Sequence, residues 1–327
     1  MRLALALLAA ALLSGCESIA FYAQAIGGQL GVMRSARPLE SWLADPQTSP
    51  QLRARLETAR RIREFASREL GLPDNGSYAS YADLRRPYVV WNVFAAGRFS
   101  VEAKRECFPF TGCVSYRGFF SEDLARRHAE RLRRDGYDVH IAGVPAYSTL
   151  GWFDDPLLST FILYPDTQLA RLLFHELAHQ VAYARDDTAF NESFAVTVEE
   201  EGVRRWLRAE GRPGELAAFR AVQARKREFA ASVAATRARL AAIYEKDISP
   251  EEKQAGKALE FARLRAEYGN VVPMEPNNAF LVSVAVYTQL VPAFERLLAD
   301  CGGNLPAFYA RVRELSAVKT AADRRSF

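Results

Sequence analysis

The stretch HELAH at residues 175–179 lies inside an apolar segment and decides both the local fold and the chemistry of this chain. Apolar residues fall on most sides of the segment, which predicts a buried helix over Thr167–Arg185. Residues four apart share one face of a helix, so His175 and His179 can hold a single metal ion with two imidazoles. Glu176 lies one step round the helix, where a general base that takes a proton from water is needed.

The alternative is a solvated helix face on which these side chains coincide by chance. The chain contains four histidines, and two of them belong to this stretch. A buried helix carries two histidines and a glutamate at low cost only when they are paired or bound to a metal. Zn²⁺ is the expected ion, because it takes imidazole and carboxylate ligands and lowers the pKa of bound water towards neutrality.

A hydrolytic zinc site needs a third protein ligand and one open position. A third histidine six residues after the stretch would give the metzincin arrangement, but that position is Arg185. The remaining histidines, His128 and His140, lie upstream and are expected to be structural or surface residues. A carboxylate is therefore the expected third ligand, and Glu192 is the candidate.

Helix geometry supports Glu192. Residues 186–188 form a polar turn that can cap a second helix over Thr188–Glu210. If the first helix ends near Arg185, His179 lies about 9 Å from the turn and Glu192 about 6 Å from it. In an antiparallel hairpin these heights nearly match, so Glu192 can reach the same ion. The alternative is an ordinary first-turn glutamate that favours the helix dipole.

Peptide cleavage also needs a donor for the developing oxyanion. Tyr287, on a predicted helix, and Tyr147, in the loop before the zinc helix, are the candidates, although buried tyrosines are commonly core residues. Glu199, two turns after Glu192, can hold a histidine from behind or form a surface ion pair. Residues 139–147 can form an edge strand that pairs with an extended peptide.

The N-terminus has the pattern of a bacterial signal peptide. A positive charge is followed by an apolar run at residues 3–13, which is too short for a stable transmembrane helix. The run ends in LSGC at residues 13–16 and resembles a lipobox, which implies cleavage before Cys16 and lipid attachment to its thiol. Glu17 favours the periplasmic face of the outer membrane. A secreted protein with an accidental cysteine is the alternative.

The other cysteines agree with that compartment. Cys107 and Cys113 enclose a short loop, and in an oxidising periplasm we expect a disulfide between them. A zinc site at this pair is the weaker alternative, because no matching second pair exists. Cys301 is expected to be buried and inert.

Composition is that of a globular protein, with a formal net charge of +4 and no long basic run or phosphate-binding loop, so nothing suggests a nucleic-acid partner. Strands are predicted near residues 88–95, 114–120 and 137–142, and helices dominate the second half. The expected fold class is α+β, predominantly helical, with a zinc-binding helix hairpin. The expected segments are a signal peptide at 1–15, a membrane-proximal tether at 16–48, a mixed α/β lobe at 49–165 and a helical zinc-binding lobe at 166–327.

Two resemblances extend this interpretation. HELAHQ followed by FNESFA resembles the gluzincins, which implies that Glu192 is a zinc ligand. Asn191 matches the Asn that precedes this Glu in their motif, and Ala195 matches a small residue that lets the two helices approach. The connection between His179 and Glu192 is shorter than in those enzymes. Most of the chain also resembles proteobacterial lipoproteins described as predicted aminopeptidases. The stretches at residues 107–118, 144–154 and 175–195 carry this resemblance.

The sequence therefore predicts a zinc-dependent peptidase that acts on peptide substrates and is anchored to the membrane through Cys16. Aminopeptidase activity is what the family resemblance implies, although no Gly-x-Met-x-Asn run precedes the zinc helix. Two alternatives stay open. One is a non-catalytic zinc-containing scaffold of the envelope, which would not need Glu176. The other is a zinc amidase that acts on peptidoglycan peptides.

Overall fold

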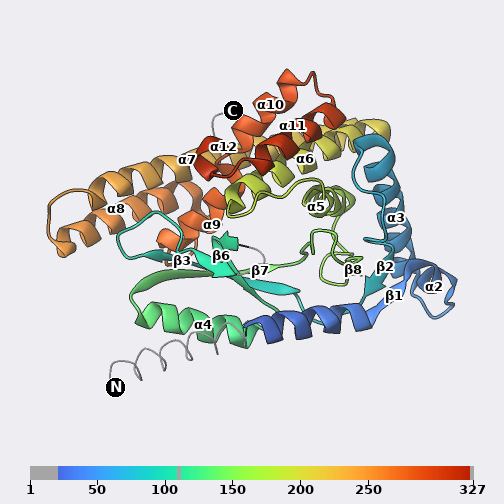
Figure 1. Ribbon diagram of the computed structural model, residues 1–327, viewed down its shortest axis with the longest axis horizontal. Helices are drawn as coiled ribbons and strands as arrows, with labels where there is room; N and C mark the ends of the chain where they lie inside the picture. The colour runs from blue at the N-terminus through green and yellow to red at the C-terminus, as the bar shows by residue number, and fades with distance from the viewer. Residues whose placement is uncertain (1–20, 109–111, 325–327) are drawn as a thin grey trace.

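A computed structural model describes residues 21–108 and 112–324 of the chain (Figure 1). The fold is α+β and predominantly helical, as the sequence predicts. The predicted signal peptide and the lipidation residue Cys16 lie outside the described residues.

The helices and strands follow one another with short connections. The strands are β1 (Ala36–Pro38), β2 (Ser80–Ala82), β3 (Val90–Gly97), β4 (Glu106–Phe108), β5 (Gly112–Val114), β6 (Tyr116–Phe119), β7 (Tyr137–Val144) and β8 (Leu157–Leu158). The helices are α2 (Leu39–Ala44), α3 (Pro50–Leu70), α4 (Glu122–Arg134), α5 (Asp166–Ala178), α6 (Thr188–Ala209), α7 (Pro213–Tyr244), α8 (Pro250–Tyr268), α9 (Asn278–Thr288), α10 (Val291–Asp300), α11 (Leu305–Ala317) and α12 (Ala321–Arg324), with a 3₁₀ turn at Gly269–Val271. Residues 21–35 are also helical.

The longest sheet has the order β6-β3-β7, and both pairings are antiparallel. Successive side chains of β3 point to opposite faces. Trp91, Val93 and Ala95 pack with α4, whereas Phe94 and Ala96 pack with α9. Figure 1 shows α4 and α9 on opposite sides of this sheet. Because both faces are covered, β3 is apolar apart from the buried Asn92. The β7 strand is left at one edge of the sheet.

The α3 helix has sequence signals at both ends. The side chain of Ser49 accepts a hydrogen bond from the backbone N–H of Leu52, and Pro50 occupies the first turn. At the other end Gly71 adopts a left-handed conformation with φ of 65°, which is accessible to glycine without a Cβ penalty. Gly71 and the apolar pattern before it predict a helix over residues 50–70, and the structure confirms this helix.

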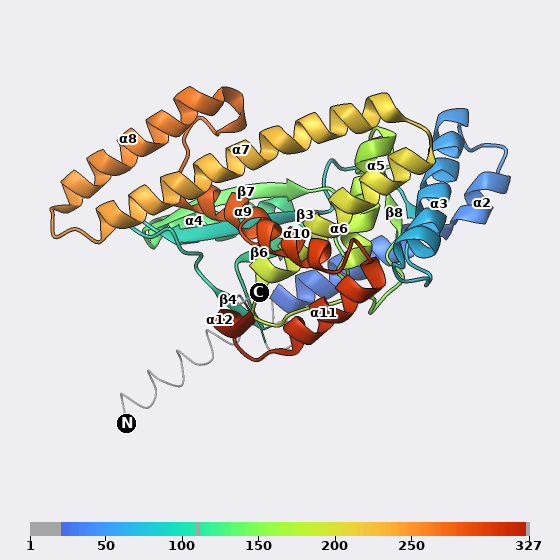
Figure 2. The ribbon, with the colours of Figure 1, turned by 90° about the horizontal axis from the view of Figure 1, so that it is seen from above.

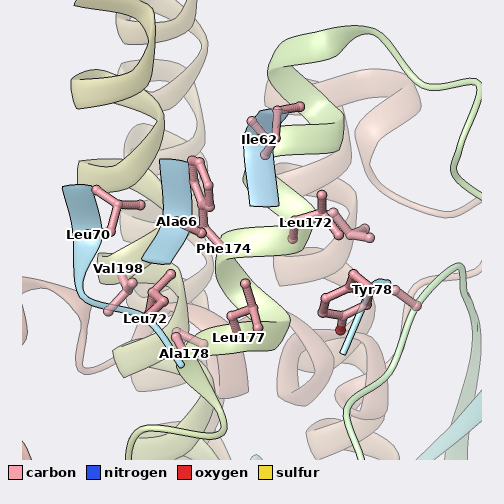
Figure 3. Close-up of a cluster of buried hydrophobic side chains, with 14 of the residues drawn as sticks. Ile62, Ala66, Leu70, Leu72, Tyr78, Leu172, Phe174, Leu177, Ala178 and Val198 are labelled. Carbon is pink, nitrogen blue, oxygen red and sulfur yellow. The ribbon is translucent and has the colours of Figure 1, made fainter. Parts of the chain in front are cut away.

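The α3, α5 and α6 helices meet around one apolar cluster (Figure 3). Ile62 and Leu70 of α3 lie in the same buried core as Phe174 and Leu177 of α5. The largest core cluster takes residues from each of the three segments predicted after the signal peptide, from Val32 to Val312. The candidate metal-binding stretch is therefore held by the main core of the molecule.

Small residues allow α5 and α6 to approach each other. Ala195 is fully buried, and Gly202 lies still closer to its neighbours. A Cβ atom added at Gly202 would lie 2.7 Å from Phe174 Cδ2 and 2.8 Å from Leu70 Cδ1. Glycine at position 202 thus lets α6 lie close to both α5 and α3.

The predicted length of the first hairpin helix is wrong. The sequence predicts that it continues to Arg185, but α5 ends at Ala178, with His179 as its C-terminal cap. The N–H and C=O groups of Ala184 are both hydrogen-bonded to the carboxamide of Asn191, at 2.7 and 2.9 Å. This pairing removes the backbone of Ala184 from helical hydrogen bonding, so the connection to α6 is a longer irregular turn.

A second predicted helix is divided in the structure. The sequence predicts one helix from residues 277–278 to Leu298, whereas α9 ends at Thr288 and α10 begins at Val291, with Pro292 in its first turn.

Within the described residues, Asn278–Asp300 alone is long and apolar enough to cross a membrane. The α9 part of this stretch packs against β3, β7, α6 and α7, as a core element does.

The α7 and α8 helices form a helical hairpin, which the sequence predicts from the helix restart at Ser249 and Pro250. Ser249 and Glu252 make reciprocal hydrogen bonds with each other's backbone at the start of α8, which is a capping box. Val233 and Leu240 of α7 are buried with Phe261 and Leu264 of α8. Figure 2 shows α7 running along the molecule from the end near α3 and α5 to the tip of this hairpin.

Candidate metal centre

The structure brings together His175 from α5, His179 at the C-terminal cap of α5 and Glu192 in the first turns of α6. His175 Nε2 and His179 Nε2 are 3.2 Å apart. Glu192 Oε2 lies 3.3 Å from His175 Nε2 and 3.7 Å from His179 Nε2. Two nitrogens and one carboxylate oxygen therefore converge on one point at the junction of the two helices.

This donor set fits Zn²⁺. Zinc takes bonds of about 2.0–2.1 Å to imidazole nitrogen and carboxylate oxygen, so ligand atoms around a tetrahedral ion lie about 3.3 Å from one another. The three separations in the structure scatter around that value. Among the described residues, this is the one group of histidine, cysteine and acidic side chains placed to hold a metal ion.

The electrostatics of the cluster also favour a cation. Burial lowers the pKa of His175, but hydrogen bonds and charges from Glu192 and Glu199 outweigh burial and raise this pKa to about 10. Burial raises the pKa of Glu192, whereas hydrogen bonds from His175 and His179 hold it well below its usual range. Both shifts arise because buried carboxylates and imidazoles lie in direct contact, so each favours the charged form of the other.

Glu199 supports His175 from behind. Its Oε2 lies 2.9 Å from His175 Nδ1, and Arg171 Nη1 donates to both Glu199 oxygens at 2.9 and 3.1 Å. Glu199 is 2 % exposed, so the alternative of a surface ion pair is wrong. A carboxylate on Nδ1 fixes the proton there and turns the lone pair of Nε2 towards the convergence point.

Glu176 lies beside the cluster and is 8 % exposed. Burial raises the pKa of its carboxyl group, and the nearby Glu192 and Glu199 raise it too, against the lowering effect of His175 and His179. A carboxylate with a raised pKa is better matched to accept a proton near neutral pH than an ordinary surface glutamate.

The two candidate tyrosines occupy different positions. The ring of Tyr287 lies 6.5 Å from the ring of His175, and burial raises the pKa of its phenol well above the usual value. Tyr147 donates its hydroxyl hydrogen to Gln29 Oε1, on the helix of residues 21–35. Tyr287 is thus the tyrosine next to the candidate metal ligands, while the hydroxyl of Tyr147 is held by the N-terminal helix.

Sequence reasoning missed Tyr116 as a site residue. Tyr116 belongs to β6, and its hydroxyl group donates a hydrogen bond to Glu192 Oε1 at 3.2 Å. This is the carboxylate oxygen that does not face the histidines. Burial raises the pKa of Tyr116 well above its usual value. The only sequence signal was its position next to Arg117 and Gly118 in a stretch that carries the family resemblance.

His128 and His140 lie elsewhere, as the sequence predicts. His128 Nε2 is 4.0 Å from Glu106, and its ring packs against Phe119. The ring of His140 packs against Phe94 and Phe280.

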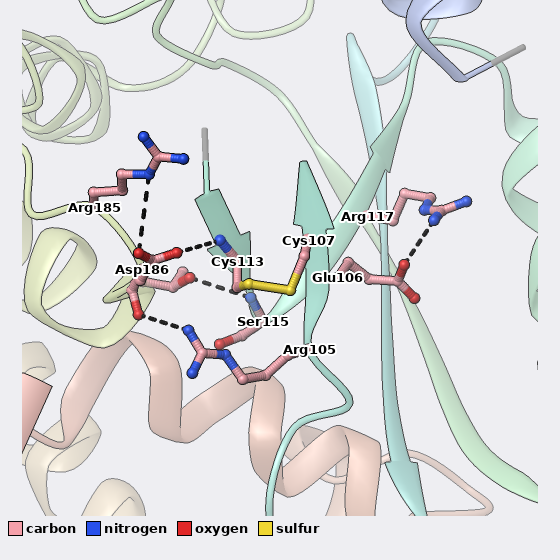
Figure 4. The surroundings of a disulfide bond; sticks show 9 residues. Arg105, Glu106, Cys107, Cys113, Ser115, Arg117, Arg185 and Asp186 are labelled. Carbon is pink, nitrogen blue, oxygen red and sulfur yellow. Dashed lines mark hydrogen bonds and ion pairs between the residues drawn. A yellow bond between two sulfur atoms is a disulfide. The ribbon is translucent and has the colours of Figure 1, made fainter. Parts of the chain in front are cut away.

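A disulfide-linked hairpin holds the turn between α5 and α6 (Figure 4). Cys107 of β4 and Cys113 of β5 are joined by a disulfide bond. The backbone N–H of Cys113 donates to Asp186 Oδ1 at 2.6 Å, and Arg105 Nη2 donates to the carbonyl oxygen of Asp186 at 3.1 Å. Asp186 adopts φ of 66°, so the hairpin fixes an unusual backbone conformation just before α6. Cys301 has no disulfide partner in the described part of the chain and is partly buried.

Two cavities meet at the cluster. The first has a volume of about 520 Å³ and extends from His175 towards α7. The second, of about 460 Å³, reaches the helix of residues 21–35. Both are lined by Val144 and Ala146, at and beyond the end of edge strand β7, and by Glu176 and Tyr287. A chain laid across the site would therefore pass both the candidate base and the candidate oxyanion donor.

Comparisons with known proteins give one family. The family model described as "Putative aminopeptidase" matches residues 20–327, which is nearly the whole chain and includes every residue of the site above. No curated protein and no solved structure matches the chain. A peptidase family agrees with the convergence of a base, a candidate metal-binding triad and two cavities at one point. The chain belongs to the family described as putative aminopeptidases.

Proposed function

We propose that this chain is a zinc-dependent peptidase, with His175, His179 and Glu192 as the metal ligands. The observation that carries the proposal is the set of donor separations of 3.2, 3.3 and 3.7 Å, which fits one tetrahedral ion. The family description supports peptide hydrolysis as the reaction class.

Zinc, when bound, would activate water and polarise the scissile carbonyl group. The chain's own residues supply the remaining steps. The Glu176 carboxylate takes the proton of the attacking water and passes it to the leaving amine. The Tyr287 hydroxyl donates a hydrogen bond to the oxyanion that forms on the carbonyl oxygen. Glu199 and Tyr116 keep the ligands His175 and Glu192 oriented throughout.

The edge strand β7 supports an extended binding mode. The strand ends at Val144, and Val144 and Ala146 line both cavities beside Glu176. An extended peptide can pair with the backbone of an edge strand and so be drawn across the base. This geometry suits a peptide bond in an unstructured segment rather than one inside a folded domain.

Aminopeptidase activity is the finer proposal that the family description supports. It requires a group that binds the free ammonium of the substrate. Of the acidic residues that line the first cavity, Glu199 is paired with Arg171 and Glu200 with Arg227. Comparison of peptides with free and acetylated N-termini therefore decides between exopeptidase and endopeptidase action.

We further propose that the enzyme is tethered to the periplasmic face of the outer membrane through Cys16. Four residues lie between Cys16 and Phe21, and a fully extended chain over this span reaches at most about 18 Å. Phe21, Tyr22 and Gln29 line the second cavity together with the candidate metal ligands. Tethering would hold this catalytic centre close to the membrane surface.

The deciding experiment exchanges Glu176 for Gln. The variant should bind zinc as the wild type does, because residue 176 is not a ligand, and should lose peptide cleavage by several orders of magnitude. Cleavage is followed by mass spectrometry on a peptide library with free and acetylated N-termini, and zinc by elemental analysis. Persistent cleavage by the variant would overturn the mechanism. Failure of the zinc-loaded wild type to cleave any peptide would favour the scaffold alternative.

A further inference from the structure

We infer that the cavity beside α7 binds the C-terminal end of a peptide substrate, with Gln223 on the last amide and Lys226 on the free carboxylate. This inference rests on the proposed peptidase function and deepens it, because it names the class of substrate. Gln223 and Lys226 are three residues apart on α7, so they share one helix face, and both line the cavity that begins at His175 and Glu176.

The cavity exists because α7 carries small side chains where it passes the catalytic centre. Ala230, Ala231 and Ala234 line it from α7, and Leu172 and Val291 line it from α5 and α10. A volume of about 520 Å³ is within the range of small-molecule sites. Most of this wall is apolar, so an apolar side chain is the occupant that suits it.

Gln223 is the polar group that such a wall leaves unexplained. It is 2 % exposed, and neither Nε2 nor Oε1 has a hydrogen-bond partner among the described residues. A buried carboxamide without partners costs free energy of folding, and buried polar groups in native proteins are nearly always paired. A ligand with one donor and one acceptor side by side, as a peptide group has, would pair both atoms.

The charges around the cavity favour an anion. Glu199 is neutralised by Arg171 and Glu200 by Arg227. Lys226 forms no hydrogen bond or ion pair within the part of the chain that the structure describes. Although much of this side chain is exposed, desolvation and the nearby Arg171 lower the pKa of Lys226. A carboxylate placed beside Lys226 would stabilise its charged form and so offset the lowering of its pKa by desolvation and by Arg171.

The C-terminus of a peptide carries an amide, an apolar side chain and a carboxylate close together. Its amide and carboxylate are near enough to reach two residues that are three apart on a helix, as Gln223 and Lys226 are. An acidic side chain alone would satisfy Lys226 but would leave the apolar wall and the Gln223 amide without matching groups. The structure thus assigns the α7 cavity to peptides that end in an apolar residue with a free carboxylate.

The test measures binding separately from cleavage. Isothermal titration of the full chain, carrying Glu176→Gln so that nothing is cleaved, compares Ala-Ala-Leu, whose N-terminus is free, with its C-terminal amide. The free acid should bind at least about tenfold more tightly, as a charge-assisted hydrogen bond implies. Adding Lys226→Met should remove the difference between acid and amide. Adding Gln223→Leu should weaken both about tenfold, while the ligand-free melting temperature stays the same or rises because an unpaired buried amide is removed.

Lys246→Met, which changes an exposed lysine just beyond α7, is the matched control and should leave both affinities unchanged. Equal binding of acid and amide, or an acid preference that survives Lys226→Met, would overturn the inference. The proposed function fails independently of it. A preference for the acid without any cleavage by the zinc-loaded wild type would refute the peptidase but keep the carboxylate site, and cleavage without any preference would do the reverse.

Discussion

Glu199 Oε2 lies 2.9 Å from His175 Nδ1, and the glutamate is itself held by Arg171. This contact joins the second turn beyond Glu192 in α6 to the first histidine of the candidate metal-binding stretch in α5. A carboxylate on Nδ1 favours the tautomer of His175 that carries its proton there, which leaves Nε2 free for the metal ion that we propose.

Exchanging Glu199 for Gln should lower zinc affinity by about tenfold or more, because the imidazole loses the charged partner that orients it and raises its basicity. Competition against a chromogenic chelator measures the affinity. Glu201→Gln is the control, since Glu201 lies on the same helix but pairs with Arg204 and Arg205 at the surface. Equal zinc affinity of wild type and Glu199→Gln would show that the contact has no role in metal binding.

Tyr287→Phe should lower kcat by about a hundredfold with little change in KM, because it removes a hydrogen bond made to the oxyanion in the transition state. Tyr147→Phe should have a much smaller effect, since its hydroxyl is already committed to Gln29. Steady-state kinetics on a fluorogenic peptide, with zinc content checked for each variant, separates the two. A larger loss for Tyr147→Phe would exchange the roles of the two residues.

Gly202→Ala should destabilise the fold by about 1–3 kcal/mol, because a Cβ there overlaps Phe174 and Leu70. Gly214→Ala is the matched comparison. It also lies in a helix, has no heavy atom within 4 Å of the added Cβ, and should be neutral or stabilise by up to about 1 kcal/mol. Urea unfolding followed by circular dichroism gives both free energies. Tolerance of alanine at both positions would mean that α5 and α6 can separate without loss.

Asp155 should make the stability of the protein fall as pH rises. Burial raises the pKa of Asp155 to about 7, against the hydrogen bonds from Thr149, and Glu176 adds to the shift. Between about pH 4 and 7 the folded chain keeps a proton that the unfolded chain has released, so the free energy of unfolding decreases with pH in that window.

The Asp155→Asn variant lacks this pH dependence, because its side chain does not titrate. The free energy of unfolding of the variant minus that of the wild type should therefore increase by about 2–4 kcal/mol from pH 4 to pH 7 and stay constant above pH 7. Urea titrations at intervals of one pH unit measure it. Asp154→Asn, at an exposed neighbouring position, should show no such trend. A pH-independent difference for Asp155→Asn would contradict the raised pKa.

Local signals in the sequence predicted most elements. Ser49 with Gly71, Ser121, and Ser249 with Glu252 mark helix ends that the structure reproduces, since capping depends on residues within one turn of one another. The end of α5 was not predictable in this way. The connection that follows it is held by Asn191, which comes from the next helix and takes the hydrogen bonds of Ala184.

By itself the sequence determined which side chains are candidates for binding a metal, because a spacing of four residues on a helix places His175 and His179 on one face whatever surrounds them. It also singled out Glu192 and Glu176 by residue type and position. Only the tertiary structure decided which neighbours complete the site. Tyr116 lies on a strand, 76 residues before Glu192 in the sequence, and Gln223 lies on α7, the helix that lines one wall of the cavity. Such contacts depend on how the sheet and α7 pack against the hairpin. The residue pattern within a single segment does not predict how segments far apart in the sequence pack together.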